Sequence, residues 1–282
     1  MISYFWFKCV RARAEMSVVR TLSGSNFVLG LTCLGDELFV LRNRNTHQVE
    51  VYSTAAPTDH VLLRRFSVDG LSTQNDNDIT ACANGAKQEC LYISDRDNGC
   101  IHKSTRTGVR VDRWPVPEGP NGLSLTSGNN LLVTCSSSRK LLELSSESGE
   151  RLCEIELQSR VALQLRHAIQ LATNRYLVSH CDGEISRVLA VDGDGEVSRS
   201  YGESSGAGRN QLNRPRHLTA ADGDDFVLVA DRNNSRLVLL SPDLQFVRQT
   251  KLDQMPYRLF LHRSTRRLYV GLGNNDVIVI QV

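Results

Sequence analysis

The sequence predicts an all-β fold: a six-bladed β-propeller of four-stranded antiparallel blades, closed by an N-terminal strand that pairs into the last blade. Three observations predict it. A four-strand pattern recurs six times, the last repeat lacks one strand, and a strand-like segment near the N-terminus belongs to no repeat. One such sheet cannot bury both of its faces alone, so the repeats have to stack in a closed ring.

The fifth repeat shows the pattern most clearly. Segments rich in aliphatic and β-branched residues occupy 215–221, 226–231, 236–241 and 244–248, and the connections between them contain Gly, Asp, Asn, Ser or Pro. Such segments favour strands, and such connections favour tight turns. The repeat therefore predicts four short strands joined by turns.

The same pattern recurs at intervals of about 45 residues, a spacing typical of propeller blades. Segments similar to the second strand of the fifth repeat occur at 38–42, 91–95, 131–135, 176–180 and 268–272. No segment with a helical period competes with this register.

The register of the first strands places one residue of each repeat at the mouth of a central channel. We expect this inner ring to consist of Gly30, Asp78, Gly122, Ala168, His217 and Arg258.

The sixth repeat supplies only three strands, at about 257–262, 267–271 and 277–281. Residues 17–22 resemble the fourth strands of other repeats and are expected to complete this blade. The predicted organisation is a poorly ordered lead-in at 1–15, followed by a single propeller domain at 16–282.

Composition excludes several classes of protein. The 282 residues include 33 Lys and Arg against 31 Asp and Glu, a net charge of +2, which excludes a polycationic arm and an acidic tail. No stretch approaches the ~20 apolar residues of a membrane-spanning helix. The eight cysteines are scattered without metal-ligand spacing. Free thiols favour a reducing compartment, so we expect a cytoplasmic protein that does not associate with membranes.

Two short motifs carry a family resemblance. Residues 206–215 read Gly-Ala-Gly-Arg-Asn-Gln-Leu-Asn-Arg-Pro, and residues 229–236 read Val-Ala-Asp-Arg-Asn-Asn-Ser-Arg. Together they resemble an NHL-repeat β-propeller, such as the C-terminal propeller of tripartite-motif NHL proteins. Blade five matches closely and blade two in part. The resemblance covers about 17–282 and implies the propeller fold. For function it implies binding of protein or RNA, although NHL propellers also occur in lyases and other enzymes.

The net charge is close to zero because a basic segment and an acidic segment of the sequence offset each other. Residues 205–267 contain 11 Arg and Lys against 6 Asp and Glu, whereas residues 69–100 contain 6 acidic residues against Lys87 and Arg96. Loops that join strand four to strand one share a face with those that join strand two to strand three, and variable loops on rigid sheets often bind ligands. The candidate ligand-binding residues on this loop face are Arg209, Arg214, Arg216, His217, Arg232, Arg236, Tyr257 and Arg258.

These residues favour a non-catalytic interaction module that binds a protein or acidic peptide. We expect a monomeric propeller that is not an enzyme and has no cofactor or metal. Arginine also pairs with phosphate, so the alternative is a propeller that binds single-stranded RNA, for which Tyr201 and Tyr257 are the nearby aromatic residues. A solvated arginine-rich rim without a ligand explains the same charges.

A third interpretation is a metal-dependent lyase or hydrolase that uses His167, His180 and His217 near the channel mouth. No carboxylate pair or nucleophile–base spacing accompanies these histidines in the sequence. Asp95 and Asp231 end second strands, where a carboxylate can accept backbone N–H groups, so we expect them to fix turns.

Overall fold

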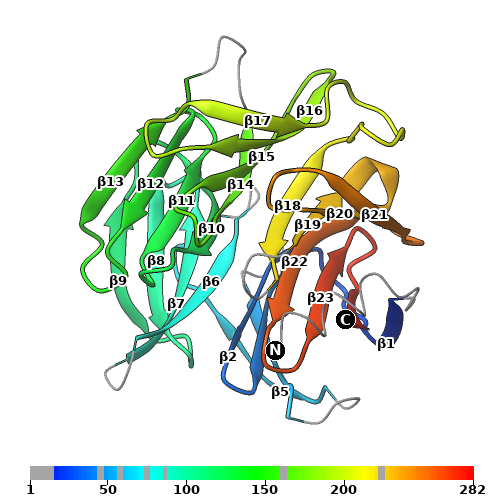
Figure 1. The fold of residues 1–282 in the computed structure, drawn as a ribbon. Helices are drawn as coiled ribbons and strands as arrows, with labels where there is room; N and C mark the ends of the chain where they lie inside the picture. Colours follow the sequence, from blue (N-terminus) through cyan, green and yellow to red (C-terminus); the bar gives the residue numbers. More distant parts are fainter. Residues whose placement is uncertain are drawn as a thin grey trace.

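The structure, a computed structural model, consists of six four-stranded antiparallel sheets arranged in a ring (Figure 1). It describes residues 16–42, 48–55, 60–72, 77–84, 88–158, 164–221 and 226–282. The predicted fold class is confirmed. The expected lead-in at 1–15 lies outside the described residues.

The strands of the first three blades follow one another in chain order. Blade 1 contains β2 (Val28–Leu34), β3 (Glu37–Arg42), β4 (Gln48–Ser53) and β5 (Leu62–Ser67). Blade 2 contains β6 (Ile79–Asn84), β7 (Gln88–Asp95), β8 (Cys100–Thr105) and β9 (Arg110–Pro115). Blade 3 contains β10 (Pro120–Leu125), β11 (Leu131–Cys135), β12 (Lys140–Leu144) and β13 (Arg151–Glu156).

The remaining blades complete the ring. Blade 4 contains β14 (Leu165–Gln170), β15 (Tyr176–Asp182), β16 (Ile185–Val191) and β17 (Val197–Tyr201). Blade 5 contains β18 (Pro215–Ala220), β19 (Val227–Asp231), the 3₁₀ turn η2 (Arg232–Asn234), β20 (Arg236–Leu240) and β21 (Phe246–Lys251). Blade 6 contains β22 (Pro256–His262), β23 (Arg267–Leu272), β24 (Val277–Gln281) and, as its outer strand, β1 (Ser17–Leu22).

The position of a strand within a blade decides its hydrophobic pattern. The first strands β2, β6, β10, β14, β18 and β22 contact one another around the axis. Middle strands such as β11 and β20 are buried along their whole length, which explains their continuous aliphatic runs. Outer strands such as β5 and β21 alternate between half-buried and exposed residues, because only one face is covered.

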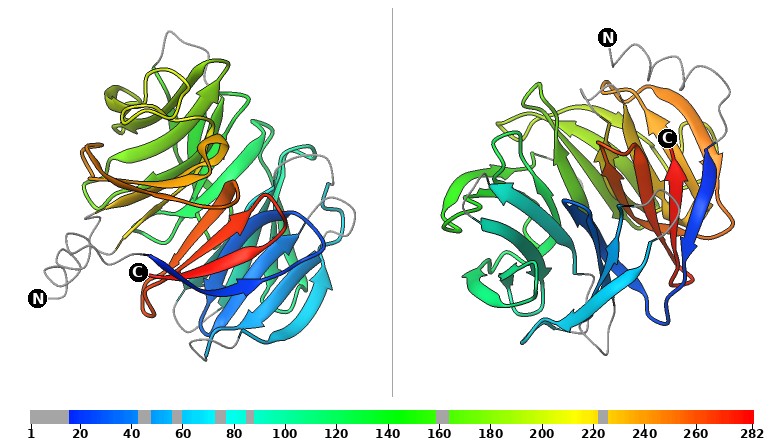
Figure 2. Two further views of the ribbon diagram at one scale, coloured as in Figure 1. Left: turned by 90° about the vertical axis from the view of Figure 1, so that its right-hand side faces the viewer. Right: turned by 90° about the horizontal axis from the view of Figure 1, so that it is seen from below.

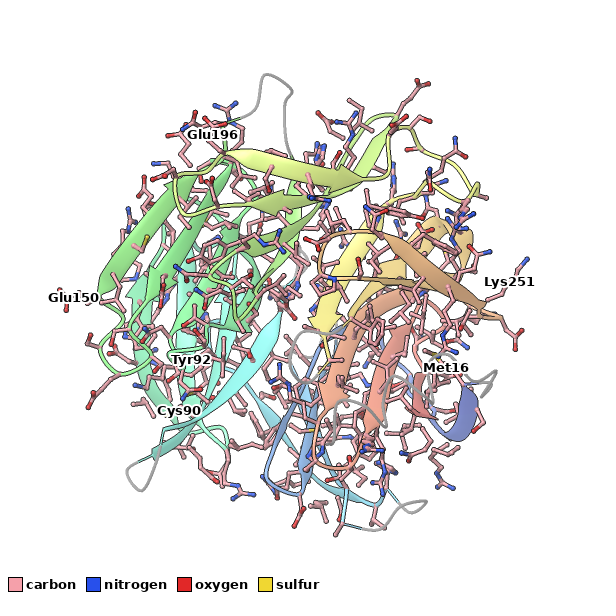
Figure 3. All side chains as sticks on the ribbon, in the orientation of Figure 1. Met16, Cys90, Tyr92, Glu150, Glu196 and Lys251 are labelled. Atoms are coloured by element: carbon pink, nitrogen blue, oxygen red, sulfur yellow. The ribbon has the colours of Figure 1, made fainter. Side chains whose placement is uncertain are left out.

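The core is a series of apolar layers between neighbouring blades. Leu177 of blade 4 packs in one cluster with Val229 and Val238 of blade 5, and a comparable cluster joins each other pair. In Figure 3, Tyr92 lies inside the molecule, whereas Glu150 projects from the periphery, in agreement with its exposure. Each blade thus depends on both neighbours for burial, which is the reason for ring closure.

The two ends of the described chain meet in blade 6. Strand β1 pairs antiparallel with β24, from Ser17 opposite Gln281 to Leu22 opposite Val277 (Figure 2). Leu22 then packs with Val28 and Tyr269 in the layer between blades 6 and 1. The predicted closure by an N-terminal strand is confirmed.

The structure corrects one position of the predicted inner ring. The ring residue lies two positions after the residue that pairs with the end of the second strand: Gly122 follows Pro120, which pairs with Cys135. In blade 4 the residue that pairs with His180 is Leu165, which places His167 in the ring. Ala168 was the expected residue, but it packs in the apolar layer between blades 3 and 4.

Two further expectations concern cysteines and membranes. The seven cysteines among the described residues are free, and five of them are buried. They behave as small apolar side chains of the core. No helix in the described ranges is both long and apolar enough to cross a membrane.

Deletion of residues 1–24 should destabilise the whole ring, because it exposes the edge of β24 and uncovers the layer around Leu22. We expect a loss of several kcal/mol and a drop in Tm of roughly 10 °C in a calorimetric scan. Deletion of residues 1–15 alone is the control that separates β1 from the residues before it. An unchanged Tm after the longer deletion would refute closure as a source of stability.

Candidate functional site at the propeller axis

Two successive layers of side chains surround the axis. The first layer is the inner ring, which the structure defines as Gly30, Asp78, Gly122, His167, His217 and Arg258. The second layer comes two residues later on each first strand, where side chains point to the same side again. It consists of Thr32, Thr80, Ser124, Ile169, Thr219 and Phe260.

Asp78 is the centre of the first layer. Its carboxylate accepts the backbone N–H groups of Ile79 at 3.0 Å and Leu123 at 3.1 Å. Its oxygens lie 3.6 Å from Arg258 Nε and 3.5 Å from His217 Nε2. Burial alone would raise the pKa of Asp78. The nearby Arg258 and His217 outweigh this effect and lower the pKa below its usual value, to about 2. Asp78 is therefore a buried anion at neutral pH.

Arg258 extends from blade 6 across blade 1 to reach this anion. Its Nε donates to the carbonyl oxygen of Leu29, and its Nη2 donates to the carbonyl oxygen of Asn77 at 3.1 Å. Its neighbour across the strand pair is Gly271, where a Cβ would lie 3.4 Å from the Arg258 Cβ. The guanidinium thus joins blades 6, 1 and 2 around one charge.

The two glycines of the ring allow close approach of neighbouring blades. A Cβ at Gly30 would lie 2.7 Å from the backbone nitrogen of Ile79. A Cβ at Gly122 would lie 2.6 Å from the carbonyl oxygen of Arg166 and 2.9 Å from the Cα of His167. Only glycine fits there without movement of a neighbouring first strand.

His167 is held as a neutral side chain. Its Nε2 lies 3.1 Å from the carbonyl oxygen of Leu123, and the Leu218 N–H donates to its Nδ1 at 3.4 Å. These contacts require a proton on Nε2 and a lone pair on Nδ1. Burial and the neighbouring His217 hold the pKa of His167 well below its usual value. Both ring nitrogens are therefore used within the fold.

His217 stacks on His167 with ring centroids 3.6 Å apart. Burial lowers the pKa of His217 in spite of the nearby Asp78. Its Nε2 faces the Asp78 carboxylate, and its Nδ1 is buried. Asp78 and the Leu218 backbone both favour a proton on His217, but burial outweighs them.

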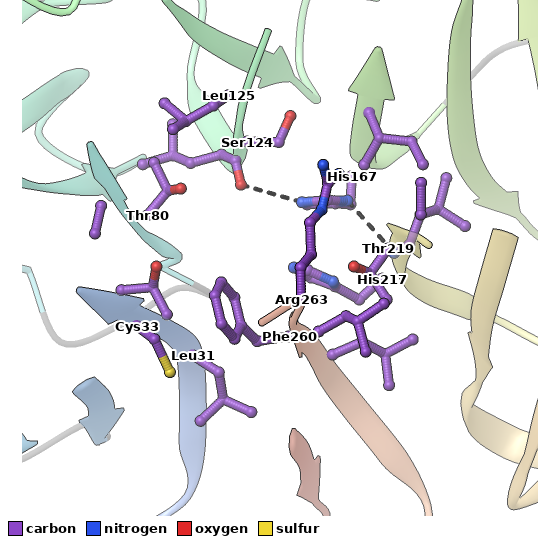
Figure 4. Close-up of a pocket in the computed structure, with 18 of the residues that line it drawn as sticks. Leu31, Cys33, Thr80, Ser124, Leu125, His167, His217, Thr219, Phe260 and Arg263 are labelled. Carbon is purple, nitrogen blue, oxygen red and sulfur yellow. Dashed lines mark hydrogen bonds between the residues drawn. The ribbon is translucent and has the colours of Figure 1, made fainter. Parts of the chain in front are cut away.

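The second layer lines a cavity of about 670 Å³, the axial cavity, which has His167 and His217 at its inner end (Figure 4). Leu31, Leu125 and Phe260 contribute apolar wall, and hydroxyl groups lie between them. The cavity extends to the hairpins that join first and second strands, where Ser127 and Arg263 are exposed. It therefore opens on the face opposite the predicted loop face.

The predicted ligand-binding residues separate into two groups. His217 and Arg258 belong to the axial layer described above. Arg236 is also buried: it donates to Asp231 at 2.6 Å and to the carbonyl oxygen of Gln211 at 2.6 Å, which fixes the loop before β18. These three side chains therefore serve contacts within the propeller.

The other predicted residues lie toward the loop face. Arg209 and Arg214 are exposed and Arg232 is half-buried, whereas Arg216 and Tyr257 are buried, each 8% exposed. The guanidinium carbons of Arg216 and Arg232 lie 5.7 and 4.4 Å from the centre of the Tyr257 ring, a cation–π arrangement. A role for this group in ligand binding stays a prediction.

Asp95 and Asp231 each connect two loops. Asp95 accepts the N–H groups of Asn98 and Ser72 at 3.2 and 3.0 Å. Asp231 accepts the N–H of Asn213 at 2.7 Å, from the loop before its own first strand. The carboxylates therefore fix the segment that leads into the first strand as well as the turn after the second.

Asp78, His167 and His217 also offer three metal-ligand atoms within 4.8 Å of one another. The atoms are already engaged, since Leu123 bonds both the carboxylate and His167, and the Arg258 cation lies beside Asp78. His180, named with them from the sequence, is not part of this cluster. The three side chains are therefore better suited to hydrogen bonds within the fold than to binding a metal ion.

The Gly122→Ala substitution should force the first strands of blades 3 and 4 apart at the axis. We expect a loss of about 1–3 kcal/mol, the usual cost of overpacking, measured by urea denaturation. Gly193→Ala is the matched control, because a Cβ there meets no atom within 4 Å. Equal stability of the two variants would contradict the close approach.

The Asp78→Asn substitution should cost about 3–5 kcal/mol at pH 7, because it leaves Arg258 buried without its anion. The folded-state pKa of Asp78 is depressed, so its contribution is present above pH 4 and is lost as pH falls toward 2. The difference in the free energy of unfolding between the wild type and the Asp78→Asn variant should therefore shrink by about 2 kcal/mol as the pH falls from 5 to 2.

Asp243→Asn, which removes a surface ion pair with Arg175, serves as the control for that measurement. It should cost less than about 1 kcal/mol. If the difference in unfolding free energy between the wild type and Asp78→Asn does not change with pH, Asp78 is not a buried anion.

The comparisons with known proteins agree on the fold. No family model and no curated protein matches the chain. A catalytically inactive virginiamycin B lyase from Staphylococcus aureus with quinupristin superposes with a TM-score of 0.65 and 9% identity, over 95% of this chain and 100% of that one. Hydrazine synthase of Kuenenia stuttgartiensis superposes with a TM-score of 0.63 and 11% identity, over 93% of this chain and 97% of that one.

Raptor of Chaetomium thermophilum gives a TM-score of 0.64 and 12% identity, over 94% of this chain and 28% of that one. At such identities these likenesses concern the fold alone. The six-bladed propeller is therefore shown, and the NHL assignment remains a resemblance.

Proposed function

We propose that this propeller is a non-catalytic binding module that receives part of a protein or peptide partner in the axial cavity. The observation that carries the proposal is the cavity itself: about 670 Å³, apolar walls, interspersed hydroxyl groups and an opening at the hairpin face. Apolar walls combined with placed polar groups are typical of ligand pockets.

The chemistry of the cavity favours binding over catalysis. Cys33 lines the wall, but burial raises the pKa of its thiol well above the usual value despite Arg267 nearby. The protonated thiol is a poor nucleophile. Asp78 is bound by Arg258 and two backbone N–H groups, so it is poorly placed to accept a substrate proton.

The exposed rim favours a protein or peptide over a small apolar molecule. Arg263 and Ser264 of the β22–β23 hairpin and Ser127 of the β10–β11 hairpin surround the opening. An extended partner can place one side chain in the cavity while its backbone and acidic groups contact this rim. The acidic peptide was predicted for the arginine-rich loop face, and the exposed Arg263 gives the hairpin face a positive charge that suits the same kind of partner.

RNA receives less support from the loop face. Base recognition uses aromatic faces, and both nearby tyrosines are buried: Tyr201 is 6% exposed and Tyr257 is 8% exposed. Arg216 and Arg232 lie over the Tyr257 ring, and Phe27 packs against it edge to face. These contacts leave no open ring surface on Tyr257 for a base.

A displayed library of random peptides, selected on the purified protein, tests the proposal. Sequences enriched on the wild type should bind at least about tenfold more weakly to a Thr219→Trp variant, because the indole fills the cavity. Thr219 is half-buried in the wall, so the larger side chain has space toward the opening.

An Arg209→Ala/Arg214→Ala double variant, which removes exposed charges on the opposite face, is the matched control and should bind normally. Enrichment of no peptide, or loss of binding in the control alone, would contradict the proposed site. Salt-sensitive binding of a single-stranded RNA oligonucleotide that is lost only in the control would support the RNA alternative instead.

A further inference from the structure

The second layer of the axial cavity presents hydroxyl groups on opposite sides of the axis. Thr80 belongs to β6 of blade 2 and Thr219 to β18 of blade 5, three blades apart in a ring of six. Both residues line the cavity, and Figure 4 shows them on opposite sides of it. A group that enters between the apolar walls therefore lies between two hydroxyl groups.

The fold does not use these two hydroxyl groups. Neither of them makes a hydrogen bond to another residue in the part of the chain that the structure describes. Thr80 is 9% exposed and Thr219 is half-buried, yet their hydroxyl oxygens are not enclosed, in contrast to the oxygen of Thr134 in β11. Because neighbouring first strands pack on both sides of β6 and β18, the accessible oxygens lie toward the cavity that both residues line.

Ser124 of β10 adds a third polar group, with a fixed role. Its Oγ donates to the carbonyl oxygen of Ala168 at 2.8 Å, so in any further hydrogen bond this oxygen is the acceptor. A threonine hydroxyl can both donate and accept. The second layer therefore offers donors and acceptors to a ligand at the same level of the cavity.

This level of the cavity offers no counter-ion. Among the described residues that line the cavity, Arg263 at the opening is the one with a permanent charge. Beneath the second layer, the Asp78 carboxylate already lies beside Arg258, at 3.6 Å from its Nε. A carboxylate or ammonium group placed between the hydroxyl groups would lose its hydration without gaining an opposite charge. A neutral polar group avoids that cost.

We infer that the group which the partner places in the axial cavity is a carboxamide, the end group of a glutamine or asparagine side chain. A carboxamide carries two N–H donors and an acceptor oxygen at one planar end, so it can donate to Ser124 Oγ and accept from a threonine hydroxyl. An apolar end group would cut the hydroxyl groups off from water and leave them without partners. This inference rests on the proposed function, since it names the group that the cavity receives.

The walls of the cavity suit the rest of such a side chain. Leu31, Leu125 and Phe260 supply apolar surface around the hydroxyl groups (Figure 4). The methylene groups of glutamine or asparagine gain from contact with this surface. The cavity thus combines an apolar passage with a polar level that a carboxamide can satisfy.

Three small probes test the inference: butyramide, butyrate and 2-pentanone, which share one three-carbon chain and differ at the end group. They are titrated into protein with ¹³C-labelled threonine methyl groups and followed by NMR. Butyramide should bind about tenfold more tightly than 2-pentanone, which lacks the donor, and than butyrate, which carries the charge. The methyl resonances of Thr80 and Thr219 should shift, whereas that of Thr134 should stay in place.

A Thr80→Val/Thr219→Val double variant removes both hydroxyl groups and keeps the shape of the side chains. The substitutions break no hydrogen bond among the described residues, so we expect the variant to fold. The preference for butyramide over 2-pentanone should fall to about one. Thr134→Val is the matched control, because it makes the same change in β11 away from the cavity lining, and it should retain the preference.

Equal binding of butyramide and 2-pentanone to the wild type, or tighter binding of butyrate, would overturn the inference whether or not the double variant folds. An unchanged preference in a folded double variant would overturn it as well.

The peptide selection distinguishes failure of this inference from failure of the proposed function. In an enriched peptide, replacement of the inserted glutamine or asparagine by glutamate or aspartate should weaken binding by about tenfold. Enriched peptides that lose binding in Thr219→Trp but contain neither glutamine nor asparagine would remove only the inference. Absence of any enriched peptide would remove the proposed function.

Discussion

The ring depends on one buried negative charge. Asp78 sits at the axis, where its carboxylate contacts backbone from blades 2 and 3 and charged or polar side chains from blades 5 and 6. Apolar layers hold each blade to its neighbours, but they do not reach across the centre. The Asp78–Arg258–His217 group supplies directional contacts there, and Gly30 and Gly122 provide the space that it needs.

This group also gives the two ends of the axis different characters. On one side, second-layer side chains line a cavity that opens between the hairpins. On the other, arginine side chains pack on Tyr257 and into the loops before β18. The hydrogen-bonded first layer thus closes the inner end of the axial cavity that the second layer lines. His217 belongs to the first layer and also lines the cavity.

Most of the fold was predictable because blade repeats leave a strong signal in strand length, turn composition and spacing. Closure through residues 17–22 was predictable from a missing strand in the last repeat. The inner ring was predicted at five of six positions. The error at Ala168 arose because the hairpin between the first and second strands differs in length among the blades, so a count of residues does not fix which residue of β14 lies at the axis.

The site was harder to predict because arginine-rich loops look the same whether they face solvent or the interior. Arg236 and Arg258 are buried, and the sequence signal was available only in part: Asp231 stands five residues before Arg236, a spacing that suits a contact across a hairpin. The cavity had a fainter signal, hydroxyl residues two positions after the ring residue on four first strands. Which of them line a cavity depends on how the blades tilt.

The pairing of β1 with β24 has a consequence for how the chain folds. Strand β1 has to wait until β24, at the far end of the propeller sequence, has been synthesised, so the apolar layer around Leu22 and Tyr269 cannot form before then. Such distant pairing slows folding and leaves strand edges uncovered in the meantime. The nascent ring is therefore most vulnerable to aggregation just before the contact that makes it stable.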